Sequence, residues 1–376
     1  MTRIVVAGGG TGGHLYPGLA IARALVKARS SIEPLFIGAR RGIERDVLPK
    51  TEFPHLLLDL HPLYRTAVWN NWRTIVGGVS GWRAVGQLMR RDPATVIVGT
   101  GGYAAGITLG YGVVHHIPIV QQIGDVRPGL TARFFSRWTR EAYLNFPEAA
   151  LVLKAHHEGA LVDTGMPIDP PPVPRPDRRA ARARWSFPAD GGSVLLIYCG
   201  SQGSLAVNRV VADWVAQGLP AGLHLLWTTG RATYDQFKHL ESPTVRVCDY
   251  QSPASDAYAV ADLALARAGA TTTAELLAWG IPAVLVPLPT AAADHQTTNA
   301  VALEQAGAAI HVPQSKLTTQ RLDETVRALL ADPAALARLV AVAAVRARPN
   351  AAAEIARRIL AVVDEVSRAQ PRSSRA

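Results

Sequence analysis

The chain has 376 residues, of which 48% are hydrophobic and 18% are charged, and its formal net charge at pH 7 is +10. This composition is typical of a globular protein and excludes a disordered chain, and the length suffices for two domains that each have a core. The positive charge fits an anionic partner (phosphate groups, nucleic acid or an acidic membrane surface), but it also fits a generally arginine-rich proteome.

The cysteines and the N-terminus bear on the compartment. Cys199 and Cys248 lack the spacing of metal ligands and cannot make a disulfide framework, which predicts a reducing compartment. The N-terminus runs directly into an apolar strand, so we expect no signal peptide. Residues 95–124 carry no charged side chain, but their repeated glycines and the pair His115 and His116 favour a buried strand–helix–strand unit. No transmembrane helix is therefore predicted.

In the first half of the chain, strand-like runs alternate with amphipathic segments, which predicts βαβ units and a parallel sheet. The predicted strands are residues 3–9, 34–39, 56–60, 94–100 and 117–122. Residues 166–179 follow, and their repeated prolines exclude both a helix and a central strand. This stretch is the predicted boundary between two domains.

After the proline-rich stretch the same alternation begins again. The predicted strands of the second half are residues 193–200, 223–230, 244–250, 261–269 and 282–289. The sequence therefore predicts an α/β protein with two Rossmann-like domains that face a central cleft. The predicted parts are residues 1–165, a linker at 166–179, residues 180–348, and a C-terminal helix and frayed tail at 349–376.

Glycine-rich turns follow strands in both halves. The turn at residues 8–13 satisfies G-x-G-x-x-G, in which backbone N–H groups and a helix N-terminus can approach a phosphate. An enzyme that uses NAD would have an acidic residue at the end of the second strand, where Arg40 and Arg41 stand instead; NADP is tolerable there. Further glycine turns lie at 99–103, 200–204 and 267–272. Turns of this kind in both halves favour a nucleoside diphosphate on one side and another phosphorylated ligand opposite.

Five motifs carry a resemblance to a known family. In chain order they are GGTGGHLYPGLAIA, GTGGYAAG, GSQGS, RAGATTTAELLAWGIPAVLVPLP and ADHQTTNA. They resemble the MurG family, whose members transfer N-acetylglucosamine (GlcNAc) from UDP-GlcNAc to undecaprenyl-diphospho-muramoyl-pentapeptide (lipid I) and so form lipid II of peptidoglycan. The resemblance extends over residues 3–346. It implies a GT-B fold, inversion at the anomeric carbon, and transfer without a metal or other cofactor.

The resemblance assigns most donor contacts to the second half. It implies that residues 270–272 face the α-phosphate from a helix N-terminus, which agrees with the anion preference of helix N-termini. Glu275 would hold the ribose hydroxyls, because two acceptor oxygens suit a vicinal diol; a surface glutamate is the alternative. Gln296 and Asn299 would read the GlcNAc hydroxyls, as amides both donate and accept. The full implied donor set is Thr11, Gly12, Gly13, Asp125, Ser201, Gln202, Gln251, Ala270, Thr271, Thr272, Glu275, Gln296 and Asn299.

His14 is the residue implied for catalysis. The attacking muramoyl 4-hydroxyl needs a proton acceptor, and histidine titrates near neutral pH. The alternatives are that His14 donates a hydrogen bond to the leaving diphosphate or that it caps or packs the helix. On the acceptor side the resemblance implies Gly101, Gly102 and Tyr103. The sequence has no D-x-D pair for a metal, so N–H groups, helix ends and side chains must stabilise the leaving group.

The first half departs from the family pattern at three places. Where the family has His-Glu-Gln-Asn, residues 122–125 read QIGD, so that Asp125 replaces a donor-contacting asparagine. Residues 165–169 read GMPID, in which Asp169 replaces a ligand-contacting arginine, and Arg127 is the candidate for a compensating cation. Residues 105–107 read AGI in place of Ser-Gly-Pro. These changes leave room for a divergent transferase with another acceptor.

A stretch near the middle of the first half has the composition of a membrane-surface helix. Residues 63–91 combine tryptophans and arginines with no acidic residue, although glycines at 77, 78 and 81 weaken a helix. One helical face would carry Trp72, Ile75, Val76, Val79 and Trp82. Such a face suits anionic lipid, and a core-packing face is the alternative. Together with the resemblance it predicts peripheral binding to the cytoplasmic face of the cell membrane.

The expected function is inverting transfer of GlcNAc from UDP-GlcNAc to lipid I. Two alternatives within reach are a UDP-sugar transferase with another lipid acceptor and a non-catalytic sugar-nucleotide-binding homologue. An NADP-dependent oxidoreductase would explain the first glycine turn alone. The chain has no basic and aromatic strand pattern of the kind that binds nucleic acid, so no nucleic-acid partner is expected.

Overall fold

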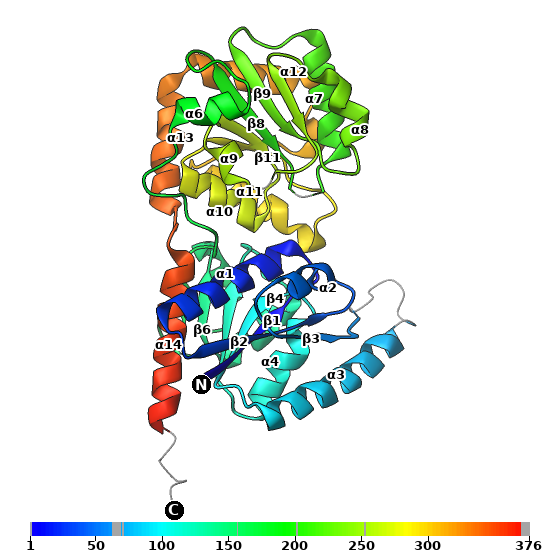
Figure 1. Ribbon diagram of the computed structural model, residues 1–376, viewed down its shortest axis with the longest axis vertical. Coiled ribbons are helices and arrows are strands. Elements are labelled where there is room, and N and C mark those ends of the chain that lie inside the picture. Colours follow the sequence, from blue (N-terminus) through cyan, green and yellow to red (C-terminus); the bar gives the residue numbers. More distant parts are fainter. Residues whose placement is uncertain are drawn as a thin grey trace, which may run out of the picture. The chain divides into compact units, whose positions relative to one another are not determined.

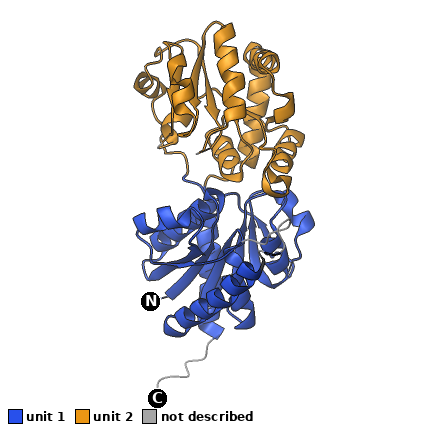
Figure 2. Cartoon of the chain, turned by 90° about the vertical axis from the view of Figure 1, so that its right-hand side faces the viewer, with its two compact units in different colours: residues 1–169, 350–376 blue, residues 170–349 orange. Residues whose placement is uncertain are grey.

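The computed structural model describes residues 2–61, 69, 71–155, 157–200, 202–251 and 253–369. The chain divides into two compact units (Figures 1 and 2). The first unit combines Met1–Asp169 with Asn350–Ala376, and the second is Pro170–Pro349. Each unit is built on one parallel sheet, so the predicted α/β class with two Rossmann-like domains is confirmed.

The sheet of the first unit has seven parallel strands in the order β3-β2-β1-β4-β5-β6-β7. The strands are β1 (Thr2–Gly8), β2 (Ile32–Ala39), β3 (His55–Leu58), β4 (Val96–Gly101), β5 (Ile119–Ile123), β6 (Thr139–Leu144) and β7 (Leu161–Asp163). The five predicted runs correspond to β1–β5. The last two strands were not predicted, because β6 carries Arg140 and Glu141 and β7 has only three residues.

Helices fill the connections of the first unit. The α-helices are α1 (Gly12–Ala28), α2 (Glu44–Val47), α3 (Asn71–Arg91), α4 (Ala105–Val114), α5 (Leu130–Phe135) and α14 (Ala351–Ala369). The 3₁₀ helices are η1 (Leu48–Lys50), η3 (Ser136–Trp138) and η4 (Pro147–Val152). The uncharged stretch at 95–124 is β4, α4 and β5, as the strand–helix–strand prediction requires.

Alternate residues of the central strands feed two separate cores. In β1, Ile4 and Val6 join a cluster with α1 and α14, while Val5 and Ala7 join a second cluster with α3 and α4. This follows from the period of two in a strand, which sends successive side chains to opposite faces. Strands that are buried on both faces read as continuous apolar runs, and that is why the sequence displayed them clearly.

Helix α14, which was predicted at 351–368, packs within the first unit although it follows the second unit in the chain (Figure 1). Its side chains Ile355 and Ile359 are fully buried in the cluster that includes α1. Arg29 at the end of α1 makes two hydrogen bonds to the carboxylate of Asp364, at 2.7 and 2.9 Å. The C-terminal helix is therefore part of the first core.

The sheet of the second unit has six parallel strands in the order β10-β9-β8-β11-β12-β13. The strands are β8 (Ser193–Tyr198), β9 (Leu223–Thr228), β10 (Val245–Cys248), β11 (Leu263–Ala266), β12 (Ala283–Leu285) and β13 (Ile310–His311). The five predicted runs correspond to β8–β12, and only the two-residue β13 was not predicted. Trp214 and Trp227 are the largest fully buried side chains of its core.

The helices of the second unit cover this sheet (Figure 1). The α-helices are α6 (Arg178–Arg184), α7 (Leu205–Gln217), α8 (Tyr234–Phe237), α9 (Ser255–Tyr258), α10 (Ala270–Trp279), α11 (His295–Gln305), α12 (Thr319–Ala331) and α13 (Pro333–Arg346). The 3₁₀ helices are η5 (Lys238–Leu240), η6 (Ala292–Asp294) and η7 (Gln314–Lys316). Asp177 caps α6 by accepting the N–H of Ala180 at 2.8 Å, so that helix begins inside the proline-rich stretch.

The search for helices that could cross a bilayer gives one result for the described part of the chain. No single helix there is long and apolar enough to cross a membrane. One bent pair, Thr319–Ala331 with Pro333–Ala369, passes the test of length and composition together.

Candidate functional site

The motif residues of the second unit gather at one edge of its sheet. Parallel strands bring their carboxyl ends to the same edge, and Gln202, Gln251, Ala270 and Gln296 all follow such ends, those of β8, β10, β11 and β12. The order of the strands reverses between β8 and β11, and ligands of open α/β sheets bind where it reverses. Ser201, which was also predicted in this set, lies outside the described residues.

The N-terminus of α10 has the character of an anion site. Its N-cap is Gly269, which has no side chain to accept a hydrogen bond, and the first turn carries no acidic residue. Thr273 turns its hydroxyl back to the carbonyl of Gly269 at 3.1 Å. By contrast, the hydroxyl of Thr271 is buried and has no hydrogen-bond partner among the described residues. Backbone N–H groups, the positive end of the helix dipole and a buried hydroxyl thus meet at one place.

Gln251 supplies a second unsatisfied polar group at this edge. Its side chain is buried, and within the described part of the chain both its amide oxygen and its amide nitrogen lack a hydrogen-bond partner. Buried polar groups are almost always paired, so such a group indicates a missing partner. Gln202 is exposed at the turn after β8. Gly203 forms that turn with a positive φ, and a Cβ there would overlap the carbonyl of Thr229.

Glu275 lies one turn into α10 and is oriented by a tyrosine. The hydroxyl of Tyr258 donates to its Oε2 at 2.7 Å. Burial, together with the negative charge of Glu275, raises the pKa of Tyr258, so the phenol stays a proton donor. Tyr258 was not predicted from the sequence, where a tyrosine in a short helix carries no functional signal.

The two amides predicted to read the sugar are placed differently. Gln296 uses its Oε1 to accept the N–H of Leu288 at 3.0 Å. Asn299 is fully buried, and its Nδ2 donates to the carbonyl of Ala268 at 3.1 Å. Asn299 therefore braces the turn between β11 and α10 from inside the unit.

Arg267 opens the turn predicted at 267–272, but the sequence predicted no role for its side chain. It is buried beside the same turn, and its guanidinium donates to Ser204 Oγ at 2.6 Å and to Gln314 Oε1 at 2.7 Å. It also donates to the carbonyls of Val286 and Pro287. These bonds tie together the turns after β8, β11 and β12. An arginine at the end of an apolar strand was the available signal.

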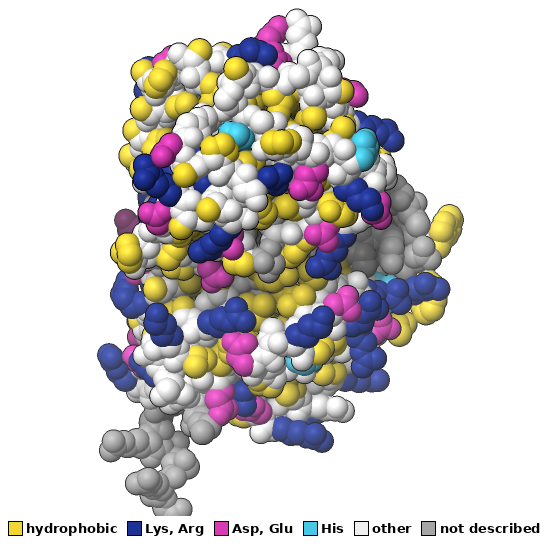
Figure 3. Space-filling view, turned by 45° about the horizontal axis from the view of Figure 1, so that its top comes forward, with side chains coloured by type: hydrophobic (Ala, Val, Ile, Leu, Met, Phe, Trp, Pro, Cys, Tyr) yellow, Lys and Arg dark blue, Asp and Glu magenta, His cyan; other side chains and the backbone are white. Residues whose placement is uncertain are grey.

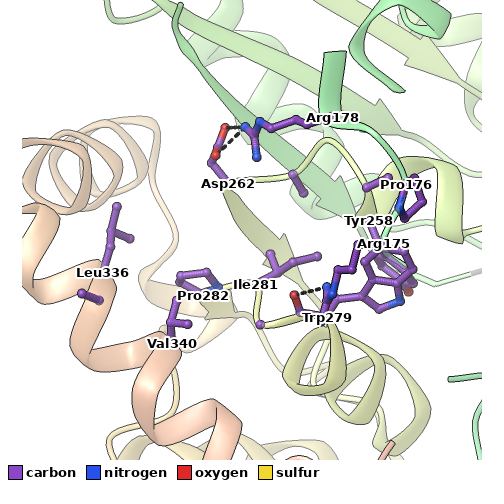
Figure 4. A pocket seen from close by; sticks show the side chains of 14 residues that line it. Arg175, Pro176, Arg178, Tyr258, Asp262, Trp279, Ile281, Pro282, Leu336 and Val340 are labelled. Atoms are coloured by element: carbon purple, nitrogen blue, oxygen red, sulfur yellow. Dashed lines mark hydrogen bonds and ion pairs between the residues drawn. The ribbon is translucent and has the colours of Figure 1, made fainter. Parts of the chain in front are cut away.

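A pocket of about 400 Å³ lies at the opposite, amino-terminal edge of this sheet (Figure 4). Its charged groups are matched by the protein itself. Arg178 and Asp262 form an ion pair at 2.5 Å, and Arg175 donates to the carbonyl of Trp279 at 2.8 Å (Figure 4). None of the residues that line it belongs to the predicted site.

In the first unit, the predicted residues likewise follow carboxyl ends of strands. After β1, the turn carries Thr11 and the start of α1 carries Gly12, Gly13 and His14; Gly101 ends β4, and Gly102 and Tyr103 lie in the turn that follows. The strand order reverses between β1 and β4. Gly102 has a positive φ, and a Cβ there would overlap the carbonyl of Gly9. The two turns therefore pack backbone against backbone.

His14 is held by this arrangement in one tautomer. Its Nδ1 lies 3.1 Å from the carbonyl oxygen of Thr100. Because a carbonyl oxygen can only accept, Nδ1 carries the proton of this bond, and the neutral ring has its lone pair on Nε2. The side chain is partly exposed. These are the properties that a general base needs.

The two aspartates that depart from the family pattern also lie in the first unit. Asp125 is partly exposed in the turn after β5, where Asn145 donates to the carbonyl of Gly124 at 2.9 Å. Arg23 is one cation close enough to Asp169 to interact with its charge. The compensating role of Arg127 stays a prediction. The hydrogen bond to Glu52 and, as a smaller contribution, the charge of Asp169 raise the pKa of Arg23.

Helix α3 carries the predicted membrane face. Trp72, Ile75 and Val79 are 58%, 67% and 49% exposed. Trp82 is half-buried, with its ring centre 5.3 Å from that of Tyr111. Gly77 lies against the backbone of residue 59, where a side chain would clash, so the glycines let the helix pack closely on the unit.

Two further features bear on where a ligand could bind, namely the surface charges and the potential metal ligands. On the face seen in Figure 3, Lys and Arg side chains are scattered, with Asp and Glu between many of them. Among the described residues, no three His, Cys, Asp or Glu side chains come together as metal ligands.

Comparison with known families matches both units. The model of the glycosyltransferase family 28 N-terminal domain matches residues 4–144, and that of the family 28 C-terminal domain matches residues 194–355. The first match covers β1–β6 with the turns after β1 and β4, and the second covers β8–β13 with the start of α10.

Curated relatives match over nearly the whole length. A protein of Salinibacter ruber is 38% identical over 96% of this chain and 97% of its own length. It is named UDP-N-acetylglucosamine–N-acetylmuramyl-(pentapeptide) pyrophosphoryl-undecaprenol N-acetylglucosamine transferase. A protein of Moorella thermoacetica with the same name is 35% identical over 96% of this chain and 99% of its own. The crystal structure of Acinetobacter baumannii MurG matches with a TM-score of 0.76 and 25% identity, over 96% of this chain and all of that chain.

Proposed function

The chain belongs to glycosyltransferase family 28, and on this basis we propose that it transfers GlcNAc from UDP-GlcNAc to the muramoyl 4-hydroxyl of lipid I, which forms lipid II for peptidoglycan. The observation that carries the proposal is the 38% identity, over 96% of the chain, to a relative named for this reaction. A match that extends through both units includes the donor and the acceptor halves of such an enzyme.

The second unit binds the donor in this proposal. The N-terminus of α10 takes the diphosphate, with the hydroxyl of Thr271 as an additional donor. Glu275, held by Tyr258, accepts hydrogen bonds from the ribose hydroxyls. Gln251 pairs with the uracil or the ribose, and Gln202 and Gln296 lie beside the diphosphate and the sugar. Support comes from the buried polar groups of Thr271 and Gln251, which have no hydrogen-bond partner among the described residues and which a bound nucleotide would satisfy.

The first unit supplies the base and the acceptor contacts. The acceptor oxygen forms a bond to C1 of GlcNAc while the bond from C1 to the β-phosphate oxygen breaks with its electron pair, so that UDP leaves. The hydroxyl proton passes to Nε2 of His14. Attack from the side opposite the leaving group inverts C1. The tautomer that Thr100 imposes on His14 supports this role.

Stabilisation of the leaving diphosphate falls to the protein's own groups in this proposal. The N–H groups at the start of α10 are oriented before the reaction, so they need no reorganisation as negative charge develops on UDP. No cofactor is assigned to the site.

We also propose that the chain works at the cytoplasmic face of the cell membrane as a peripheral protein. Lipid I carries a polyprenyl chain, so its transferase must meet a bilayer. The exposed apolar side chains of α3, with arginines at 73 and 83 on the same helix, suit the surface of an anionic membrane.

The test is transfer of labelled GlcNAc from UDP-GlcNAc to a lipid I analogue in vesicles, with EDTA present. Formation of labelled lipid II supports the donor, the acceptor and the absence of a metal requirement together. If UDP binds but no lipid II forms, the donor half of the proposal stands and the acceptor half falls, in favour of another lipid acceptor or of a sugar-nucleotide-binding protein without turnover. The absence of UDP affinity would contradict the whole proposal.

A further inference from the structure

A buried carboxylate lies beneath the first glycine turn. Glu44, the first residue of α2, has no exposed surface. Its Oε1 accepts the N–H of Gly10 at 2.8 Å and the N–H of Ala39 at 3.2 Å. Its Oε2 is buried and has no hydrogen-bond partner among the described residues. The side chain thus joins the turn after β1 to the end of the neighbouring strand β2.

The backbone closes tightly around this carboxyl group. A Cβ at Gly9 or Gly42 would overlap the carboxyl group, and one at Gly38 would press against the Cγ of Glu44. Gly9 also has a φ of +140°, a conformation that L side chains rarely adopt. Three glycines are therefore accounted for by the space that one glutamate needs.

This arrangement changes the meaning of the G-x-G-x-x-G motif. In dinucleotide-binding proteins the glycines let backbone N–H groups reach a ligand phosphate. Here the N–H of Gly10 already donates to a carboxyl oxygen of the protein itself. A phosphate at Gly10 would therefore lack this donor, because Glu44 already occupies it.

The same turn carries the base of the proposed reaction. The N–H of Gly9 donates to the carbonyl of Gly101 at 3.2 Å, and His14 lies against Gly101, where a Cβ would crowd its ring. Nδ1 of His14 is fixed by the carbonyl of Thr100. Glu44, the two turns and His14 therefore form one hydrogen-bonded block.

We propose that Glu44 is a positioning residue, which occupies the place of a phosphate at Gly10 and holds the turn at residues 9–14 so that His14 is oriented before substrate binds. The inference rests on the proposed function, in which His14 receives the proton. It assigns the donor diphosphate to the second unit alone, because the Gly10 position is occupied from within.

The test compares Glu44→Gln with Glu52→Gln, a matched change at an exposed glutamate of the same unit. The amide of Glu44→Gln keeps an oxygen for Gly10 but places an NH2 group, which can only donate, at the buried position of Oε2, where no hydrogen-bond partner lies among the described residues. We expect kcat to fall by about tenfold or more, since small displacements of catalytic groups have such effects. The KM for UDP-GlcNAc and the Kd for UDP should stay within about twofold, and Glu52→Gln should match the wild type throughout.

Two further measurements keep the inference falsifiable if Glu44→Gln folds poorly. Gly42→Ala displaces the carboxyl group of Glu44 without changing its chemistry, and it should lower kcat in the same way. Hydrogen exchange should be slow at the Gly10 amide of the wild type, and in Glu44→Gln it should speed up at residues 9–14 while α10 is unchanged. Wild-type kcat in both variants would overturn the inference, and so would loss of UDP affinity in step with kcat.

These results separate the inference from the proposed function. If the wild type binds UDP but makes no lipid II, the acceptor proposal fails, while the exchange at Gly10 still reports on Glu44. If lipid II forms and both variants at this carboxylate are fully active, the function stands and the positioning role fails.

Discussion

Each unit has a glycine-containing turn at the point where its strand order reverses. The two turns differ in what their hydrogen-bond donors contact. After β1, the N–H of Gly10 donates to the buried carboxylate of Glu44. After β11, α10 begins at Gly269 with no acidic residue in its first turn, and the hydroxyl of Thr271 lacks a partner among the described residues. One turn is satisfied from within the protein, and the other has donors for a ligand.

The comparison teaches that glycines alone do not specify a phosphate site. Glycine permits the close approach of a backbone N–H group, but another residue decides what approaches it. In the first unit that residue is Glu44, 34 positions along the chain from Gly10. The turn that looks most like a dinucleotide site is therefore the one that carries the proposed base.

The largest expected effect comes from removing that base. His14→Ala should lower turnover by about a hundredfold or more, because general-base catalysis contributes this much. The Kd for UDP should change by less than about twofold, since the donor diphosphate is assigned to the other unit. Steady-state kinetics and calorimetric titration of the same preparation check both values. Near wild-type turnover would remove His14 from the mechanism and break the comparison.

The exposed apolar face of α3 offers the next test, because the proposal assigns membrane binding to the first unit and not to the second. Ile75→Ser on α3 removes apolar surface without adding a charge, and it should weaken binding to vesicles that contain anionic lipid by about tenfold or more, given the apolar area that one isoleucine buries. The matched control is Val345→Ser on α13 of the second unit, where the replaced side chain is 74% exposed. Sedimentation with vesicles measures both variants. Equal losses, or no loss for Ile75→Ser, would remove the lipid-binding role of α3.

Variants at Glu275 test the proposed contact with the ribose of the donor. Glu275→Gln should weaken UDP binding by about tenfold, because hydrogen bonds to a charged group contribute about 1.5 kcal/mol. Tyr258→Phe keeps the ring and removes only the hydrogen bond to Glu275, so its effect should be smaller. As a control, 2′-deoxy-UDP keeps only the 3′-hydroxyl, so Glu275→Gln should weaken the binding of 2′-deoxy-UDP less than the binding of UDP. An equal loss with both nucleotides would show that Glu275 does not contact the diol.

Thr271 gives the smallest effect and the most specific one. Thr271→Val keeps the shape of the side chain, and we expect UDP to bind about threefold more weakly, since one hydrogen bond from a hydroxyl is lost while the backbone N–H groups at the start of α10 still bind the diphosphate. The free energy of unfolding should stay the same or rise, because the hydroxyl that is removed is buried without a partner among the described residues. Calorimetry and thermal unfolding measure the two quantities. Weaker UDP binding accompanied by lower stability would indicate a structural role instead.

The sequence predicted what depends on local pattern. The strands that are buried on both faces appear as apolar runs, and ten of the observed strands were found in this way. It missed β6, where Arg140 and Glu141 interrupt the run, and the short strands β7 and β13, which have three and two residues. It predicted the helix at 351–368 but could not assign it to the first core, because that depends on packing with α1.

For the candidate site, the motifs identified the turns but not the groups that support them. Glu44, Tyr258 and Arg267 act through contacts with distant residues, and no spacing along the chain encodes such contacts. Asn299 was predicted from its motif, but the motif did not indicate its contacts within the protein. Its fully buried side chain donates to the carbonyl of Ala268, and its contact with a sugar stays a prediction.

The most direct test of the difference between the two turns is amide hydrogen exchange of the full-length protein with and without saturating UDP. The account predicts slower exchange at residues 269–275 when UDP is bound, and no change at Gly10, whose N–H is already held by Glu44. Protection of residues 8–14 by UDP, with no change at the start of α10, would contradict it.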